Sequence, residues 1–132
     1  MRKKYRCLIK NEYTHNNYSL GTIQVNEIEK IRIWRNKNIK ILRQTKKIEK
    51  KQQVLYFQKN IWPDMKIKQP KNILLSFKKN NVLIGYGGLV HISWENKRSE
   101  ISFIMGDIDE NDDTYKQKFK IFFILLKKIA FK

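Results

Sequence analysis

The chain has 132 residues and carries 29 lysines and arginines against 12 aspartates and glutamates, a formal net charge of +17. A hydrophobic share of 41% is too high for a disordered basic tail, so we expect one folded domain over residues 1–132. No apolar run approaches the roughly 18–20 residues of a membrane span. The basic N-terminal segment lacks the apolar stretch of a secretory signal, so we expect a cytoplasmic protein.

The positive charge alone is weak evidence for nucleic-acid binding. Lysine and arginine release counterions from phosphate groups, so salt-sensitive binding to polyanions is expected whatever the function. The lysines are dispersed along the chain, and lysine, isoleucine and asparagine, which all have AT-rich codons, are abundant. We therefore expect no specific nucleic-acid partner, and keep a basic nucleic-acid- or ribosome-associated binding protein as the alternative function.

The first half of the chain predicts two strands and then two helices. Short strands are expected at Arg6–Ile9 and Tyr18–Val25, around a polar turn at Asn11–Asn17. Apolar residues at helical spacing predict helices over Asn26–Arg35 and Lys47–Ile61. The apolar stripe of the second helix is expected at four positions, and Pro63 is expected to end that helix. These positions are Val54, Leu55, Phe57 and Ile61.

In the second half the spacing of apolar residues changes from helical to alternating. Three strands are expected at Asn72–Phe77, Val82–Ile92 and Ser99–Met105, joined by polar hairpin turns. Three glycines within the middle strand, at positions 85, 87 and 88, predict a bulge or a close backbone approach. A final apolar helix is expected over Thr114–Phe131. The order β-β-α-α-β-β-β-α predicts an α+β fold with a mainly antiparallel sheet flanked by helices.

Three phrases resemble the GNAT superfamily of acyl-CoA-dependent N-acetyltransferases. They are IRIWRN at 31–36, LIGYGGL at 83–89 and SEISF at 99–103, and the similarity covers roughly Tyr18 to Phe131. The resemblance implies acetyl-CoA as cofactor. It also implies a primary amine as acceptor: a small molecule, an amino-sugar or a protein N-terminus.

The resemblance also implies a location for the cofactor. In the family, the pantetheine arm lies beside the backbone of the fourth strand of the fold, and backbone N–H groups at the start of the next helix hold the pyrophosphate. Gln117 would begin the pyrophosphate motif. The residues of the fourth strand are Ile101, Ser102, Phe103, Ile104 and Met105.

The same resemblance suggests a catalytic pair and three residues that contact the acceptor. Glu100 would be the general base, and His91 on the neighbouring strand would assist proton transfer. Arg35, Asn36 and Tyr86 would contact the acceptor. Each has an ordinary alternative. Glu100 could be a solvent-facing strand carboxylate paired with Lys97 or Arg98, and His91 a half-buried histidine. Tyr86 could simply fill the sheet face, and Asn36 could be a helix C-cap.

Two features depart from the family pattern. The pyrophosphate motif begins at Gln117, and two of its glycines, which would let the backbone approach phosphate, are replaced by Lys120 and Phe122. The acidic loop over Gly106–Asp113 would also repel a pyrophosphate. The family fold also continues with further strands and a helix, whereas this chain stops at Lys132. We therefore expect a truncated domain, inactive alone, that a partner chain or a strand-exchanged dimer could complete.

No metal site is expected. Asp107, Asp109 and Asn111 fit the first positions of an EF-hand loop, but Asp112 replaces its glycine and Lys118 its bidentate glutamate. A single cysteine also excludes a cysteine-rich zinc site and an internal disulfide.

Overall fold

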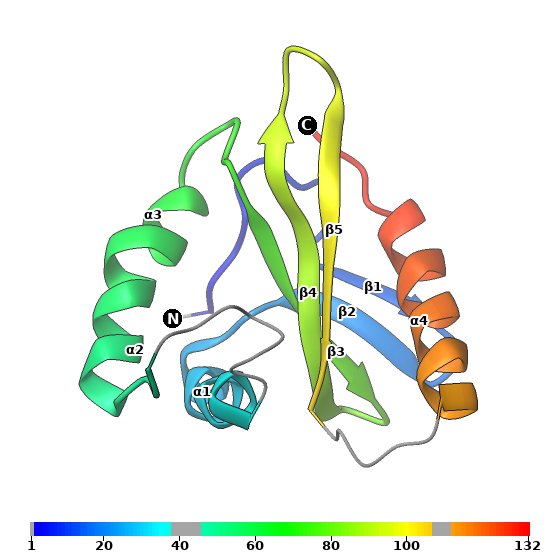
Figure 1. Cartoon of the computed structure of the whole chain (residues 1–132). Helices are drawn as coiled ribbons and strands as arrows, with labels where there is room; N and C mark the ends of the chain where they lie inside the picture. Colours follow the sequence, from blue (N-terminus) through cyan, green and yellow to red (C-terminus); the bar gives the residue numbers. More distant parts are fainter. Residues whose placement is uncertain (1, 38–45, 107–111) are drawn as a thin grey trace.

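The computed structural model describes residues 2–37, 46–106 and 112–132 (Figure 1). They form a five-stranded sheet of order β1-β2-β3-β4-β5, and every neighbouring pair is antiparallel. The strands are β1 (Glu12–His15), β2 (Tyr18–Thr22), β3 (Ile73–Lys79), β4 (Val82–Ser93) and β5 (Arg98–Met105). The helices are α1 (Ile28–Lys37), α2 (Lys50–Tyr56), α3 (Trp62–Asp64) and α4 (Asp112–Lys127). The predicted α+β fold and its order of elements are confirmed.

The helices cover both faces of the sheet. Helix α4 lies on one face, and α1, α2 and α3 lie on the other (Figure 1). On the α4 face, the ring of Phe122 lies 5.5 Å from that of Phe77 and 4.6 Å from that of Phe103. Phe77 and Phe122 are fully buried. This aromatic contact fixes α4 against β3 and β5, the strands on either side of β4. No helix within the described ranges is long and apolar enough to cross a membrane.

The first hairpin differs from the prediction. The segment predicted as a polar turn contains β1, whose Tyr13 side chain is buried, and the hairpin turns sharply at Asn16, where φ is 55°. The segment predicted as the first strand forms no strand. Instead, Leu8 makes an isolated bridge with Phe131, flanked by hydrogen bonds from Ile9 N to Ala130 O (3.0 Å) and from Lys132 N to Cys7 O (2.9 Å). Helix α4 therefore ends at Lys127, short of the predicted end at Phe131, and the C-terminal segment runs on to the N-terminal one.

The helix boundaries also shift. A 3₁₀ turn at Val25–Glu27 precedes α1, where the prediction began the helix. Helix α2 begins at Lys50 and continues through a π-helical segment, Phe57–Ile61, into α3, so Pro63 does not end the helix. In the π-helical segment the N–H of Trp62 bonds to the carbonyl of Phe57. This wider turn rearranges the backbone bonds just before the proline, which has no N–H to contribute.

The glycines of β4 allow the close approach that the sequence predicts. Gly88 has φ of 148°, and a Cβ there would lie 2.0 Å from the carbonyl oxygen of Ile73 on β3. A Cβ at Gly87 would lie 2.0 Å from the carbonyl oxygen of Ser102 on β5. The middle strand is therefore in backbone contact on both sides at this point. Just beyond it, the β4–β5 register shifts between Val90 and Ser93.

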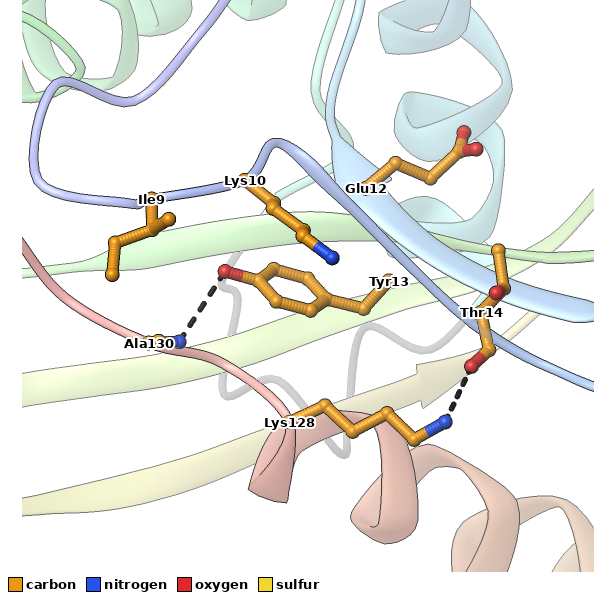
Figure 2. Close-up of a pocket in the computed structure, with 7 residues that line it drawn as sticks. All are labelled: Ile9, Lys10, Glu12, Tyr13, Thr14, Lys128 and Ala130. Atoms are coloured by element: carbon orange, nitrogen blue, oxygen red, sulfur yellow. Dashed lines mark hydrogen bonds between the residues drawn. The ribbon is translucent and has the colours of Figure 1, made fainter.

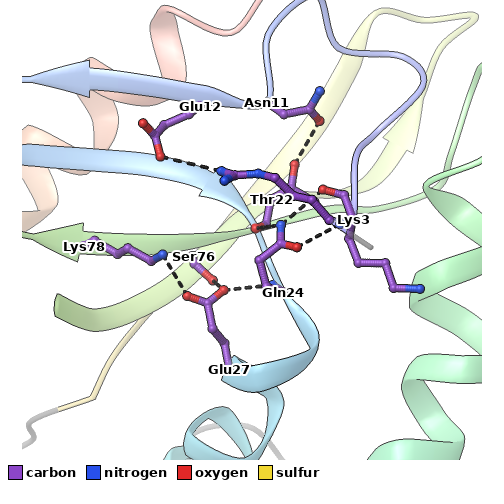
Figure 3. Close-up of polar contacts among 9 residues, drawn as sticks. Lys3, Asn11, Glu12, Thr22, Gln24, Glu27, Ser76 and Lys78 are labelled. Carbon is purple, nitrogen blue, oxygen red and sulfur yellow. Dashed lines mark hydrogen bonds and ion pairs between the residues drawn. The ribbon is translucent and has the colours of Figure 1, made fainter. Parts of the chain in front are cut away.

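A buried carboxylate ties the start of α1 to the sheet (Figure 3). Glu27 accepts hydrogen bonds from the hydroxyl of Ser76 (2.8 Å) and from the backbone N–H of Gln24 (2.8 Å). Its other oxygen lies 3.0 Å from Nζ of Lys78. The Glu27 side chain is only 8% exposed, so these three partners compensate for its lost hydration.

Replacing Glu27 with glutamine is expected to destabilise the fold by about 2–3 kcal/mol. An amide cannot neutralise Lys78, and its NH₂ group would face the ammonium. Urea unfolding followed by circular dichroism would measure the change. Glu29→Gln, which removes an exposed ion pair with Arg32 on the same helix, is the matched control and should change stability little. Equal effects of the two changes would contradict the role assigned to Glu27.

Candidate active site

The two predicted catalytic side chains meet where β4 is irregular. His91 has φ of 51°, and its backbone N–H bonds to the side-chain oxygen of Asn72 (3.1 Å) instead of following the regular ladder. This places Nε2 of His91 3.9 Å from Oε2 of Glu100. Both side chains are exposed, 77% and 73%, so a ligand could reach them. His91 is thus not the half-buried histidine of the alternative, and Glu100 makes no ion pair with Lys97 or Arg98 among the described residues.

The strand predicted to line the cofactor is the last strand of the sheet. Within the described residues, no strand pairs with the outer edge of β5. Ile101, Phe103 and Met105 share one face of the strand: Phe103 packs on α4, Met105 is buried, and Ile101 is 44% exposed. Ser102 and Ile104 are half-buried. The outer edge therefore offers backbone N–H and C=O groups to an extended ligand.

The other cofactor predictions fall on α4 and the loop before it. Gln117 is exposed on α4. The ring of Phe103 is also in contact with those of Tyr115 and Phe119 on this helix, at 5.4 and 5.3 Å. The acidic loop positions, Asp107, Asp109, Glu110 and Asn111, lie outside the described residues, as does the side chain of Asp112.

Two of the three predicted acceptor residues lie close together. Arg35 donates to the side-chain oxygen of Gln53 (3.1 Å), and its guanidinium lies 5.1 Å from the ring centre of Tyr56. Burial raises the pKa of Tyr86 to about 12, an effect that the positive charge of Arg35 partly opposes. Asn36 is engaged elsewhere: its amide donates to the carbonyl of Ile48 (3.0 Å) and accepts from that residue's N–H (2.7 Å). It therefore ties α1 to the segment that precedes α2.

Comparison with protein-family models gives a match over most of the chain. The model described as an acetyltransferase (GNAT) domain matches residues 20–132, from β2 to the end of the sequence. The chain belongs to the GNAT acetyltransferase family. No match was found among curated proteins or among solved structures. Membership supports acyl transfer as the general chemistry of this GNAT domain, and a solvent-accessible acid–histidine pair on β4 and β5 is compatible with it.

Sequence reasoning missed Gln53, which positions Arg35 in this GNAT domain. Gln53 is 1% exposed and donates from Nε2 to the carbonyl of Ile28 (3.0 Å) while its oxygen holds Arg35. The predicted stripe of α2 is wrong in part, because Val54 and Leu55 are 42% and 50% exposed. The buried face runs through Gln53, Phe57 and Ile61, at four-residue spacing. That spacing was the signal that could have identified Gln53.

Two pockets of the GNAT domain lie away from β5. One, of about 390 Å³, is lined by Ile9, Lys10, Glu12, Tyr13, Thr14, Lys128 and Ala130 (Figure 2). Its polar groups hold the C-terminal segment on β1: Ala130 N donates to the hydroxyl of Tyr13 (3.3 Å), and Lys128 to the carbonyl of Thr14 (2.6 Å). The other, of about 550 Å³, is lined by Arg6, Cys7, Lys68, Gln69, Trp94 and Lys132. Neither contains a predicted site residue.

Proposed function

We propose that this GNAT domain is an acetyl-CoA-dependent N-acetyltransferase that transfers an acetyl group to a primary amine. Family membership supports acyl transfer. The observation that carries the finer proposal is the accessible pair of Glu100 and His91, 3.9 Å apart, at the start of a strand whose outer edge is unpaired among the described residues. A proton acceptor and an extended binding edge are what amine acetylation from a pantetheine thioester requires.

The residues present fit acetyl-CoA along β5. The pantetheine arm contains amides, and the edge from Ile101 to Met105 offers backbone groups that can bond to them. When bound, the cofactor supplies an activated thioester. Lys116 and Lys120, both exposed on α4, add positive charge that would attract the anionic part of the cofactor.

Glu100 and His91 would act on the acceptor amine. An amine must be unprotonated to attack a thioester, and it loses a second proton as the C–N bond forms, the C–S bond breaks and CoA leaves. Glu100 accepts that proton, and His91, beside it, can share the proton or pass it to solvent. Their exposure leaves both groups open to an incoming acceptor. Arg35 and Tyr86, on the α1 face, would orient the rest of the acceptor.

A thermal-unfolding experiment tests cofactor binding. Acetyl-CoA at about 100 times its dissociation constant should add roughly 2.7 kcal/mol to the stability of the fold. The shift should persist at high salt and should not be reproduced by ATP. Release of free CoA in the presence of a panel of primary amines would then establish transfer. A shift that vanishes in salt, or that ATP matches, would favour the alternative, a basic nucleic-acid- or ribosome-binding protein.

The unpaired edge of β5 also supports a proposal about assembly. An open strand edge readily pairs with another strand, so a partner chain or a second copy exchanging strands could extend the sheet here. Light scattering with and without acetyl-CoA would test for a second copy. A dimer that dissociates as the cofactor binds would indicate that both use this edge.

A further inference from the structure

The hydroxyl of Tyr86 is buried without a partner. Tyr86 lies on β4, between Ser76 on β3 and Ile104 on β5, and is 7% exposed. Its hydroxyl forms no hydrogen bond within the part of the chain that the structure describes. Buried polar groups are nearly always paired, because an unpaired one forfeits its hydration without compensation. The hydroxyl is protonated at neutral pH, as in any tyrosine, and burial raises its pKa further, to about 12. It is therefore a hydrogen-bond donor that lacks an acceptor.

Arg35 is a second polar residue that lacks its usual partner, which for an arginine is a carboxylate. The residue is half-buried at the end of α1, and none of the described carboxylates forms an ion pair with it. The buried amide of Gln53 and the ring of Tyr56 fix the guanidinium in place. Gln53 accepts a hydrogen bond from one nitrogen of the Arg35 guanidinium, so most of the five N–H donors of that group remain available. A guanidinium presents its donors as a rigid fork that matches a carboxylate.

On the basis of the proposed acetyl transfer, we propose that Arg35 and Tyr86 together bind a carboxylate of the acceptor. A carboxylate would accept from the free N–H groups of Arg35 and from the hydroxyl of Tyr86. One ligand group would thus supply both the missing counter-charge and the missing acceptor. Asn36 is given no part, since its amide is held by the backbone of Ile48, to which it donates and from which it accepts.

The position of the two residues defines the shape of this acceptor. Tyr86 pairs with Ile104, four residues along β5 from Glu100. At about 3.3 Å per residue, these backbone positions are about 13 Å apart. A single α-amino acid, whose amine and carboxylate share one carbon, spans only a small part of that distance. The acceptor class is therefore an extended amine with a distant carboxylate, and a short peptide with a free N-terminus and a free C-terminus has that shape.

The test compares tetraglycine with tetraglycine amide as acceptors. The wild-type chain should acetylate the free acid with a kcat/KM at least tenfold higher than that of the amide. Arg35→Gln should abolish this preference for the free acid, and Tyr86→Phe should reduce it several-fold. Lys37→Gln removes a positive charge two residues from Arg35, on the same helix, and should keep the preference. Should Arg35→Gln fail to fold, Tyr86→Phe, which deletes only the unpartnered hydroxyl, still decides the question.

Binding measurements separate this proposal from that of catalysis. Calorimetry with tetraglycine in the presence of CoA needs no transfer step, and affinity for the free acid should fall at least tenfold in Arg35→Gln. If acid and amide are acetylated equally, the carboxylate site is wrong while acetyl transfer stands. If no peptide is acetylated but the free acid binds through Arg35, the site stands and the reaction is wrong. If Arg35→Gln weakens acetyl-CoA binding and leaves the preference for the free acid intact, the site belongs to the cofactor, which overturns the proposal.

Discussion

Glu100→Gln should lower kcat/KM for acetyl transfer by roughly 10²–10³-fold, because general-base catalysis contributes about that factor and an amide cannot accept the proton. The side chain is 73% exposed, and among the described residues it forms an ion pair with His91 alone, so the fold should be unaffected. His91→Gln should have a smaller effect, about tenfold or less, because the carboxylate would remain to accept the proton. Release of free CoA under saturating acetyl-CoA measures both variants.

Glu95→Gln is the matched control for Glu100→Gln. Glu95 is an exposed acid in the turn between β4 and β5, so its removal changes the charge of the same hairpin without touching the pair. It should leave kcat/KM unchanged. If Glu100→Gln retains more than half of the wild-type rate while acetyl-CoA still binds, the proton acceptor is another group, and the role given to Glu100 is wrong.

Gly88→Ala is expected to be the most damaging single-methyl change, with a loss of about 2–4 kcal/mol. An alanine at φ of 148° is strained, and its methyl group would lie 2.0 Å from the carbonyl oxygen of Ile73. Backbone atoms of β3 cannot move aside as a flexible side chain would, so β3 and β4 must separate. A loss of this size is a large part of the stability of a typical domain. Urea unfolding would give its magnitude.

Gly21→Ala on β2 tests whether position 88 is special. A Cβ at Gly21 would lie 3.1 Å from the carbonyl oxygen of Asn11, which a shift of a few tenths of an ångström relieves. The backbone at Gly21 is not in the left-handed region. The loss at Gly21 should therefore be less than half of that at Gly88. Similar losses of stability at both positions would show that a factor common to both glycines, such as the conformational entropy of the unfolded chain, determines the effect, rather than contact with β3.

The sequence predicted the three consecutive strands of the sheet to within a few residues. Segments β3, β4 and β5 are short, mainly apolar runs separated by polar turns, and their partners are adjacent in sequence, so local patterns suffice. Strand β1 was missed because Tyr13 is its only buried residue, and its neighbours look like a turn. Its pairing depends on β2 and on the C-terminal segment, which no local pattern reveals.

The candidate site was predictable in type but not in geometry. A histidine and a glutamate on neighbouring strands could be named from the sequence, but their meeting depends on the irregular backbone at His91. Asn36 looked like an acceptor contact because it ends a helix, yet its partner is Ile48, across a segment that sequence patterns do not place. Gln53 was overlooked because glutamine is normally exposed. Its burial depends on hydrogen bonds with Arg35 and Ile28, which are distant in the sequence.

A single cysteine beside the bridge between Leu8 and Phe131 can report when the N- and C-terminal segments separate. Cys7 is the only cysteine in the sequence, is 4% exposed, and accepts a backbone hydrogen bond from Lys132 beside that bridge. Burial also raises the pKa of its thiol, which keeps it from reacting as a thiolate. Its labelling by a thiol reagent should therefore accelerate when the two terminal segments part. The labelling rate, compared with that in denaturant, gives the free energy of that separation independently of global unfolding.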